Sequence, residues 1–396
     1  MTAAQNILDS ARIIDTDSHV IEPVDLWTSR FPRGLMEEAP RVEWDEVGQE
    51  HRWRVGEVWL AGVGEYCSAG WHEPFPSHPP TLEEADPSCW NASERAKKLD
   101  SWGVSSQLLY PNIIAFDTHV FMTELSPEAA LVCVQAYNDF LVDFANEAPG
   151  RFVPIMMLPI WDVEESVAEM HRAKALGHKG GVFAALLDQI GLPHVASGHW
   201  DPIFHTAQDL DLSLNFHLAV ATRKRDDLER GWSLRTKAAL SRRTNRLSFI
   251  KKTGLAFVSS IEATSEMILQ GICERFPRLR FVSVESGFGY WPYVLEQMDW
   301  LWASSGATKE YPDRLLPSEY WRRQFYVTFW HEHDTLAQLP NYADNVMFET
   351  DFPHETSLPS QGFGARDVAR KNLQGLDDDV VEKVLYKTAS KLYGLE

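Results

Sequence analysis

The sequence predicts an α/β protein and, within that class, a single (β/α)8 barrel of the TIM type. Three observations lead to this prediction. Short apolar segments alternate with helical segments along most of the chain, glycine or proline ends many of these segments, and the apolar segments number eight. Strands that alternate with helices pair in parallel through right-handed crossovers, and eight such units are the number that closes a barrel.

The first predicted strand covers residues 13–19. Two isoleucines run into Asp15, Asp17 and His19, and alternation places these three side chains on one face of an extended segment. Pro23 follows, and it cannot donate a hydrogen bond to a neighbouring strand. Acidic residues next to Thr or Ser are also common in turns and helix caps, so the meaning of this segment depends on what lies downstream.

Residues 28–90 interrupt the alternation. They are rich in Pro, Gly and Trp, and they contain one predicted hairpin, with strands 51–55 and 58–61 around Gly56-Glu57. Long loops inside a compact domain are commonly lids or binding loops. We therefore expect an irregular insertion or lid here, directly after the first strand.

From residue 91 onward a helix-then-strand unit recurs. Ser93 is the expected cap of a helix that Gly103 ends. Residues 375–396 are expected to form a C-terminal packing helix, so that the 396 residues make one domain. The other predicted helices cover 127–147, 163–176, 200–210 and 260–276, and the other predicted strands cover 106–110, 152–158, 180–183, 212–217, 279–285, 324–328 and 345–351.

The composition favours a cytoplasmic protein that binds neither nucleic acid nor membranes. The chain has 37 Lys and Arg against 57 Asp and Glu, a formal net charge of -20, which repels nucleic acid and anionic membrane surfaces. It has neither an apolar run long enough to span a bilayer nor the pattern of a signal peptide. Its four cysteines never form a CxxC pair, so neither a disulfide framework nor a thiolate zinc cluster is expected.

The stretch from Arg223 to Lys252 is locally basic. Within an acidic chain, such a stretch fits a subunit contact, a solvated face or a collar that attracts an anionic substrate better than it fits nucleic-acid binding.

Polar residues stand at the ends of several predicted strands. In a closed parallel barrel the carboxyl ends of all strands meet on one face, where active sites are built. Two histidines and two aspartates form a mixed nitrogen and oxygen set that suits one divalent ion, zinc first and manganese as the alternative. Taken singly, His217 could be a core histidine and Glu285 a capping residue. The strand-end residues are Asp17, His19, His217, Glu285 and Asp351.

With these motifs the chain resembles the amidohydrolase superfamily, in the branch that includes aminocarboxymuconate semialdehyde decarboxylase and the resorcylate and carboxyvanillate decarboxylases. Asp17 and His19 match the first-strand HxH metal motif, with Asp in place of the first His. Asn215-Phe216-His217 matches the fifth-strand ligand motif. Glu349 through His354 resembles the eighth-strand SDxPH signature, whose Asp is both a ligand and a proton acceptor in the family.

The resemblance implies the metal ligands Asp17, His19, His217 and Asp351 and leaves two reactions open. The first hypothesis is hydrolysis of a small amide, imide, lactone or similar compound, in which activated water attacks, the ion and His354 stabilise the oxyanion, and Asp351 moves the proton. The alternative is non-oxidative decarboxylation of an aromatic or unsaturated acid. A barrel that has lost its metal and serves as a binding module is a third reading, against which the retained ligand set argues.

The sixth-strand position, usually His in the family, is Glu285 here. A neutral imidazole can donate a proton, whereas a carboxylate acts as a base or a ligand, so the family's chemistry does not transfer residue by residue. We therefore predict Asp351, Glu285 and His354 as catalytic residues. Family members often pair, so we also expect a homodimer. Trp27, Phe216, Trp291 and Trp330 are candidates for substrate contact, with core packing as the other role of each.

Overall fold

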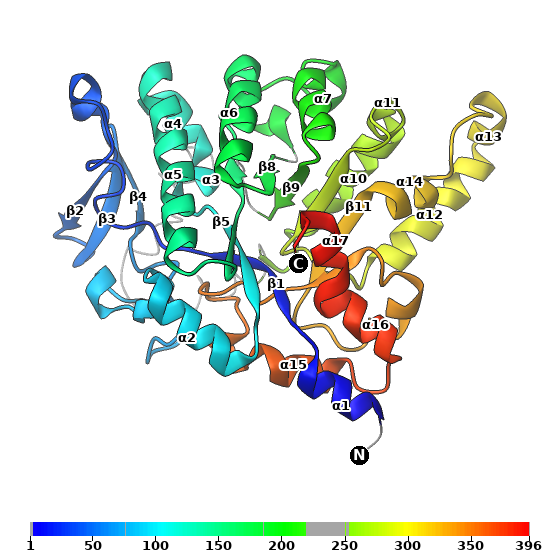
Figure 1. The fold of residues 1–396 in the computed structure, drawn as a ribbon. Coiled ribbons are helices and arrows are strands. Elements are labelled where there is room, and N and C mark those ends of the chain that lie inside the picture. Colours follow the sequence, from blue (N-terminus) through cyan, green and yellow to red (C-terminus); the bar gives the residue numbers. More distant parts are fainter. Residues whose placement is uncertain (1–2, 76, 185, 219–249, 251–252, 396) are drawn as a thin grey trace.

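The computed structural model describes residues 3–75, 77–184, 186–218, 250 and 253–395. Parallel strands occupy the centre and helices surround them (Figure 1). The α/β class predicted from the sequence is therefore confirmed. Within the described part of the chain, no helix combines the length and apolar character needed to cross a membrane. The basic stretch 223–252 lies, except for residue 250, outside the described residues.

The eight predicted strand segments are all present, and two sheets contain them. One sheet has the order β1-β5-β6 and the other the order β12-β11-β10-β9-β8-β7, with every pairing parallel. A single residue separates β6 from β7. The bounds are β1 Ile14–His19, β5 Ser106–Tyr110, β6 Phe152–Pro154, β7 Met156–Met157, β8 Gly180–Val182, β9 Ser213–His217, β10 Arg280–Val284, β11 Phe325–Phe329 and β12 Val346–Phe348.

Backbone hydrogen bonds join the first strand to the segment that follows the last one. The Asp351 N–H donates to the Asp17 carbonyl at 2.9 Å, and the His19 N–H donates to the Phe352 carbonyl at 2.7 Å. Thr16 adds a side-chain bond, because its hydroxyl donates to the Phe348 carbonyl at 2.9 Å. Residues from the two ends of the chain are thereby fixed side by side.

Most helix predictions agree with the structure. The helices α5 and α6 have the predicted bounds. The predicted helix 260–276 is interrupted at Gly271, whose positive φ of 77° starts a new helix. The α-helices are α1 Ala3–Ser10, α2 Ala92–Trp102, α3 Ile113–Phe116, α4 Thr118–Glu124, α5 Pro127–Glu147, α6 Val163–Leu176, α7 Asp201–Asp209, α10 Val258–Leu269, α11 Ile272–Arg275, α12 Trp291–Ser304, α13 Ala307–Glu310, α14 Pro317–Gln324, α15 Ala365–Asn372, α16 Asp378–Glu382 and α17 Thr388–Tyr393.

A π-helical turn at Lys383–Lys387 joins α16 to α17 in the predicted C-terminal helical region. The short 3₁₀ helices are Arg33–Glu38, Leu82–Glu84, Pro87–Cys89, Leu187–Ile190, Val195–Ser197, Leu336–Asn341 and Pro359–Gln361.

The predicted cap of α2 was wrong. Asn91, two residues before Ser93, accepts a hydrogen bond from the Glu94 N–H at 3.0 Å, and Ser93 lies inside the helix. Asparagine and serine are comparable caps, so composition alone does not choose between them. The predicted end is confirmed, because Gly103 adopts the left-handed conformation with φ 69°.

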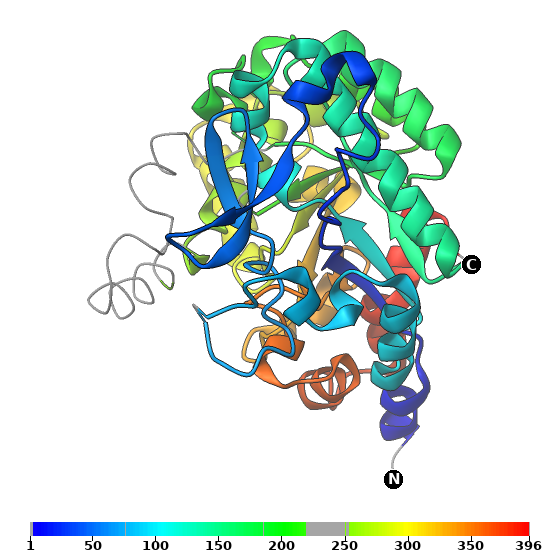
Figure 2. The same ribbon diagram turned by 90° about the vertical axis from the view of Figure 1, so that its left-hand side faces the viewer.

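Residues 28–90 contain an antiparallel sheet of three strands, β2 Arg41–Asp45, β3 Glu50–Val55 and β4 Val58–Gly62. The predicted hairpin is β3 with β4, and β2 was not predicted. The sheet stands at one edge of the molecule beside α4 (Figures 1 and 2). A later part of the segment reaches the chain after β12, since the Ala69 N–H donates to the Pro353 carbonyl at 3.1 Å.

A buried asparagine on α5 fixes the short strand β7. The Asn138 side chain donates to the Met157 carbonyl at 3.0 Å and accepts from the Met157 N–H at 2.8 Å. It also donates to Glu169 of α6 at 2.6 Å. One amide therefore satisfies both backbone groups of a residue in a strand that pairs only with β8.

We predict that Asn138→Leu lowers the free energy of unfolding by about 2–5 kcal/mol, because each unsatisfied buried polar group costs about 1–3 kcal/mol. Urea unfolding followed by tryptophan fluorescence measures this change. The matched control is Asn341→Leu, at an exposed position, with an expected change within about 0.5 kcal/mol. Equal effects of the two substitutions would contradict the role given to Asn138.

Candidate active site

The four predicted metal ligands lie together at the carboxyl ends of β1 and β9 and just after β12. The His217 Nε2 is 3.0 Å from the His19 Nε2 and 3.3 Å from the Asp17 Oδ1. The His19 Nε2 is 3.4 Å from the same Asp17 oxygen and 3.8 Å from the Asp351 Oδ1. All four side chains are buried. Ligand atoms of Asp17, His19 and His217 are close enough to share one ion, and Asp351 adjoins this group through His19.

The chemistry of this set fits a divalent cation. Both carboxylate oxygens of Asp17 and the Oδ1 of Asp351 are buried, and the ion pairs of both carboxylates are with histidines. A buried carboxylate is costly unless positive charge balances it, and two imidazole nitrogens that face each other can both offer lone pairs to a cation. Two histidine nitrogens with carboxylate oxygens are ligands that suit zinc and manganese.

The electrostatics of Asp17 and His217 also favour positive charge at this point. Burial lowers the pKa of His217, but attraction to Asp17 outweighs it and raises the pKa to about 9. Burial likewise opposes ionisation of Asp17, and attraction to His217 holds its pKa below the usual value. A metal ion between the two groups would replace the proton in this role.

Glu285 and Asp351 adopt an unusual backbone conformation. Their φ angles are 55° and 57°, in the left-handed region that side chains other than glycine rarely enter. The Glu285 N–H is held there by Thr328 Oγ1 at 3.0 Å and by Glu349 Oε2 at 3.2 Å. Strained residues of this kind persist where the surrounding structure fixes them, and they concentrate at functional sites.

Glu285 and Asp351 form a carboxyl pair around one hydroxyl. The Thr356 hydroxyl is 3.3 Å from the Glu285 Oε1 and is also in contact with the Asp351 Oδ2. Burial, and then repulsion from Asp351, raises the pKa of Glu285 well above its usual value. Burial, and then repulsion from Asp17, raises the pKa of Asp351 in the same way. Glu285 can therefore hold a proton beside the ligand set, to which Asp351 belongs.

His354 contacts Asp351, and Asn112, which was not predicted, orients the ring. The Asn112 Nδ2 donates to the Val20 carbonyl at 3.0 Å, which leaves its Oδ1 as an acceptor 2.8 Å from the His354 Nε2. The His354 Nε2 therefore carries a hydrogen, and its Nδ1 faces the Asp351 Oδ1 at 2.8 Å. The position of Asn112 just after a predicted strand was the signal that could have identified it.

Glu22 and Asp15 support this arrangement from outside the ligand set. Glu22 accepts from the backbone N–H groups of Asn112 and Ile113 at 3.2 and 3.1 Å, and burial raises its pKa to about 7. Asp15 accepts from the Thr350 N–H at 2.8 Å, and its second oxygen accepts from the Thr350 hydroxyl at 2.5 Å. The residue before Asp351 is thereby tied to β1.

Two aromatic residues that were not predicted lie against the histidines. The ring centroid of Phe116 is 6.0 Å from His19 and 5.6 Å from His217. Tyr66, which belongs to the 28–90 segment, is 5.5 Å from His354 and 5.6 Å from Phe116. These rings form an aromatic wall, and no sequence motif pointed to either of them.

The four aromatic residues predicted for substrate contact have other neighbours. Trp27 packs against Trp53 and Phe121 and donates to a backbone carbonyl on α5. Phe216 packs against Phe183 and Phe281, and Trp291 packs against Tyr290 and Trp321. Trp330 stands against His331. None of these ring contacts is with the candidate metal ligands, so their role in substrate contact stays a prediction.

Comparisons with known proteins agree with this geometry. The family model described as amidohydrolase matches residues 14–395. A 2-amino-3-carboxymuconate-6-semialdehyde decarboxylase from Dictyostelium discoideum is 23% identical over 285 residues, which cover 69% of each chain.

Solved structures share the fold at low sequence identity. An amidohydrolase from Mycobacterium avium subsp. paratuberculosis superimposes with a TM-score of 0.72 at 18% identity, over 97% of this chain and 100% of the other. A dihydroxybenzoic acid decarboxylase from Polaromonas, solved with bound manganese, superimposes with a TM-score of 0.61 at 18% identity, over 98% of both chains.

The family match extends over nearly the whole chain, and it includes every residue of the ligand set. The chain thus belongs to the amidohydrolase family, in the branch of aminocarboxymuconate semialdehyde decarboxylase, and is a metal-dependent enzyme of that family.

Proposed function

We propose that the protein is a metal-dependent carboxy-lyase that removes CO2 from an aromatic or unsaturated carboxylic acid. The observation that carries this proposal is the buried Glu285, which can hold a proton directly beside Asp351 and the rest of the ligand set. The aromatic wall and the decarboxylase relative support it. Hydrolysis, the first hypothesis from the sequence, becomes the second candidate.

The proposal includes the barrel and its insertion. The strand order, together with the hydrogen bonds from β1 to residues 351–352, supports closure of the two parallel sheets into a (β/α)8 barrel. Two contacts support a covering role for the 28–90 segment. The Tyr66 ring packs against His354, and the Ala69 N–H donates to the Pro353 carbonyl after β12.

Asp17, His19, His217 and Asp351 would hold one zinc or manganese ion. Bound there, such an ion supplies Lewis acidity toward an oxygen of the substrate. The side chains around the ion would transfer the proton and position the substrate.

Decarboxylation replaces a carboxylate with hydrogen, so the carbon must receive a proton. As the bond to CO2 breaks, its electron pair stays on the carbon and takes a proton from the carboxyl pair, which then regains one from solvent. His354, oriented by Asn112, positions the Asp351 carboxyl. Phe116 and Tyr66 would hold the substrate ring and exclude water.

The second candidate is hydrolysis of a small neutral amide, imide or lactone. One observation favours it: among the described residues, the ion pairs of Asp17, Glu285 and Asp351 are all with histidines, and none is with Lys or Arg. A neutral substrate needs no cationic side chain. In this reaction the carboxyl pair would accept a proton from water and pass it to the leaving group.

A homodimer remains part of the proposal. Tyr293, Trp300 and Leu301 of α12 are 69%, 71% and 54% exposed, and exposed apolar groups of this size commonly mark contact surfaces.

Product analysis separates the two reactions. The metal-loaded enzyme, incubated with hydroxybenzoic acids and with cyclic imides and lactones, is expected to release CO2 from an acid in equal amount to the decarboxylated product. The chelator-treated enzyme is the control and should release none. Turnover of imides or lactones without any CO2 release from the acids would overturn the carboxy-lyase proposal.

Substitution of the carboxyl pair tests its role as proton donor. We expect Glu285→Gln to lower kcat by about 10²–10⁴, the range typical of proton transfer by a positioned side chain, and to leave the metal content unchanged. Asp351→Asn should lower both kcat and the metal content. The control is Asp334→Asn, at an exposed carboxylate, which should behave as wild type. Wild-type turnover by Glu285→Gln would show that Glu285 is not the donor.

A further inference from the structure

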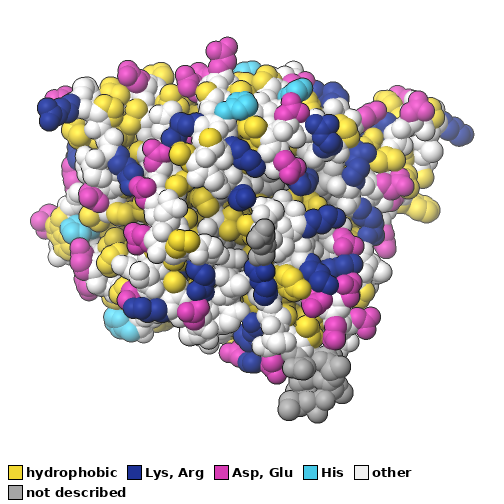
Figure 3. Space-filling view, viewed as in Figure 1, with side chains coloured by type: hydrophobic (Ala, Val, Ile, Leu, Met, Phe, Trp, Pro, Cys, Tyr) yellow, Lys and Arg dark blue, Asp and Glu magenta, His cyan; other side chains and the backbone are white. Residues whose placement is uncertain are grey.

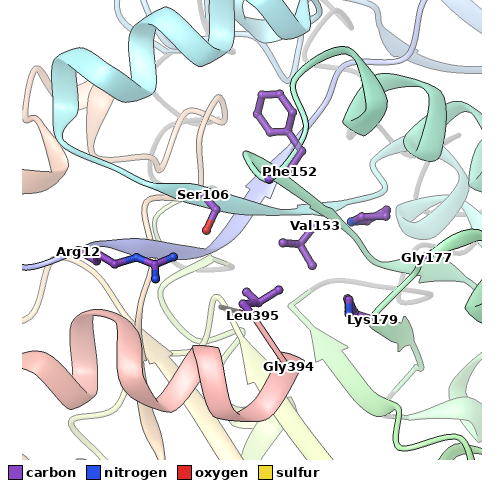
Figure 4. A pocket seen from close by; sticks show the side chains of 10 residues that line it. Arg12, Ser106, Phe152, Val153, Gly177, Lys179, Gly394 and Leu395 are labelled. Carbon is purple, nitrogen blue, oxygen red and sulfur yellow. The ribbon is translucent and has the colours of Figure 1, made fainter.

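A cavity of about 330 Å³ lies at the amino ends of the parallel strands (Figure 4). Among the residues that line it, Arg12 precedes β1, Ser106 begins β5 and Lys179 precedes β8. The ligand set stands at the carboxyl ends of β1 and β9. Because parallel strands run in one direction, the cavity and the metal ligands are separated by the length of the strands, about 16 Å for five residues.

Two cations without partners face this cavity. The Arg12 guanidinium and the Lys179 ammonium make no ion pair or side-chain hydrogen bond with the described residues. Arg12 is exposed and Lys179 is half-buried, so both charges are open to a ligand in the cavity. Lys and Arg side chains gather around the middle of this face of the molecule (Figure 3).

A buried hydroxyl points to the same space. Ser106 is 4% exposed, and its hydroxyl makes no hydrogen bond to the described residues. Its oxygen points into the cavity between Arg12 and Val153 (Figure 4). A hydroxyl that opens on a cavity can donate a hydrogen bond to a ligand there.

The two side-chain charges outweigh the helix dipoles at the cavity. Lys174, on α6, has a lowered pKa, first because of burial and then because of repulsion from Lys179, while attraction to Asp211 opposes the shift. The helices α6 and α17 end at Gly177 and Gly394 in the cavity wall, and each helix end contributes about half a negative charge. Their sum, about one charge, is smaller than the two full positive charges of Arg12 and Lys179.

The geometry points to a binding site for a small organic carboxylate, separate from the metal centre. Arg12 can bind a carboxylate through two parallel hydrogen bonds, and Lys179 adds a second positive charge. The Ser106 hydroxyl can donate a further hydrogen bond. Phe152, Val153 and Leu395 supply apolar wall for the rest of the molecule. The volume lies near the lower end of the range of about 300–1,000 Å³ for small-molecule pockets, which limits the ligand to the size of a monocyclic acid.

Such a ligand would contact the starts of β1, β5 and β8 together with the end of α17, so binding would stabilise the fold. Isothermal titration with benzoate and with inorganic phosphate, at constant ionic strength, measures the binding, and thermal unfolding measures the stabilisation. The titrations use the His217→Ala variant, so that benzoate binding at the metal centre does not contribute. We expect one saturable benzoate site and a higher Tm on binding.

In that background, Arg12→Gln and Lys179→Gln should each weaken benzoate binding at least tenfold, and Arg12→Lys should recover part of it. The control is Lys371→Gln, at an exposed lysine on α15, which should leave binding unchanged.

Four results would overturn the proposal. The first is benzoate binding that Arg12→Gln and Lys179→Gln leave unchanged, and the second is no saturable binding. The third is phosphate binding as tight as that of benzoate, because a simple anion gains nothing from the apolar wall. Benzoate binding that appears only after deletion of Glu396, the residue that follows Leu395 in the sequence, would also count against a free ligand site.

Discussion

The hydrogen bonds between β1 and the segment after β12 hold the rest of the site in place. They join residues more than 300 positions apart in the sequence: Asp351 donates to the carbonyl of Asp17, and His19 donates to that of Phe352. Because these bonds belong to the backbone, they fix the Cα positions of three of the four proposed metal ligands. Asp15 reinforces them by accepting from both the N–H and the hydroxyl of Thr350. His217, at the end of β9, completes the proposed set through its contact with Asp17.

This arrangement concentrates groups that are costly to bury. Asp17, Glu285, Glu349 and Asp351 are all buried within one region, and burial raises the pKa of the last three. Glu285 and Asp351 also hold left-handed backbone conformations, at about 1–2 kcal/mol each. A cation between the carboxylates and a proton shared by the pair would offset much of this cost. The backbone strain and the buried carboxyl groups are therefore properties expected of an enzyme site.

The sequence identified the strand ends well because strand burial and alternation are local properties. Asp17, His19, His217 and Asp351 end apolar runs, and such residues are predictable once parallel strands are recognised. Strand β2, Arg41 through Asp45, alternates in polarity as strands do, and it was missed because the content of Pro, Gly and Trp led us to expect irregular structure across residues 28–90. Phe216 was a poor candidate for substrate contact for a reason that was already visible: neighbours in a strand face opposite sides, and His217 faces the site.

The residues that sequence reasoning missed act through tertiary contacts. The Asn112 amide contacts His354, and the Thr356 hydroxyl lies between two carboxyl groups. Tyr66 contacts His354 because the 28–90 segment folds back toward the site. None of these relations has a period or a spacing in the sequence. They follow from packing, and only the structure shows them.

The central claim is that Asp17, His19, His217 and Asp351 bind one divalent ion. Diffraction from manganese-loaded crystals, recorded above and below the manganese absorption edge, tests it most directly. The account predicts one anomalous peak per chain, at bonding distance from the side chains of these four residues, and its loss in His217→Ala crystals. An empty site after loading with manganese and with zinc, or a peak bound by other residues, would contradict it.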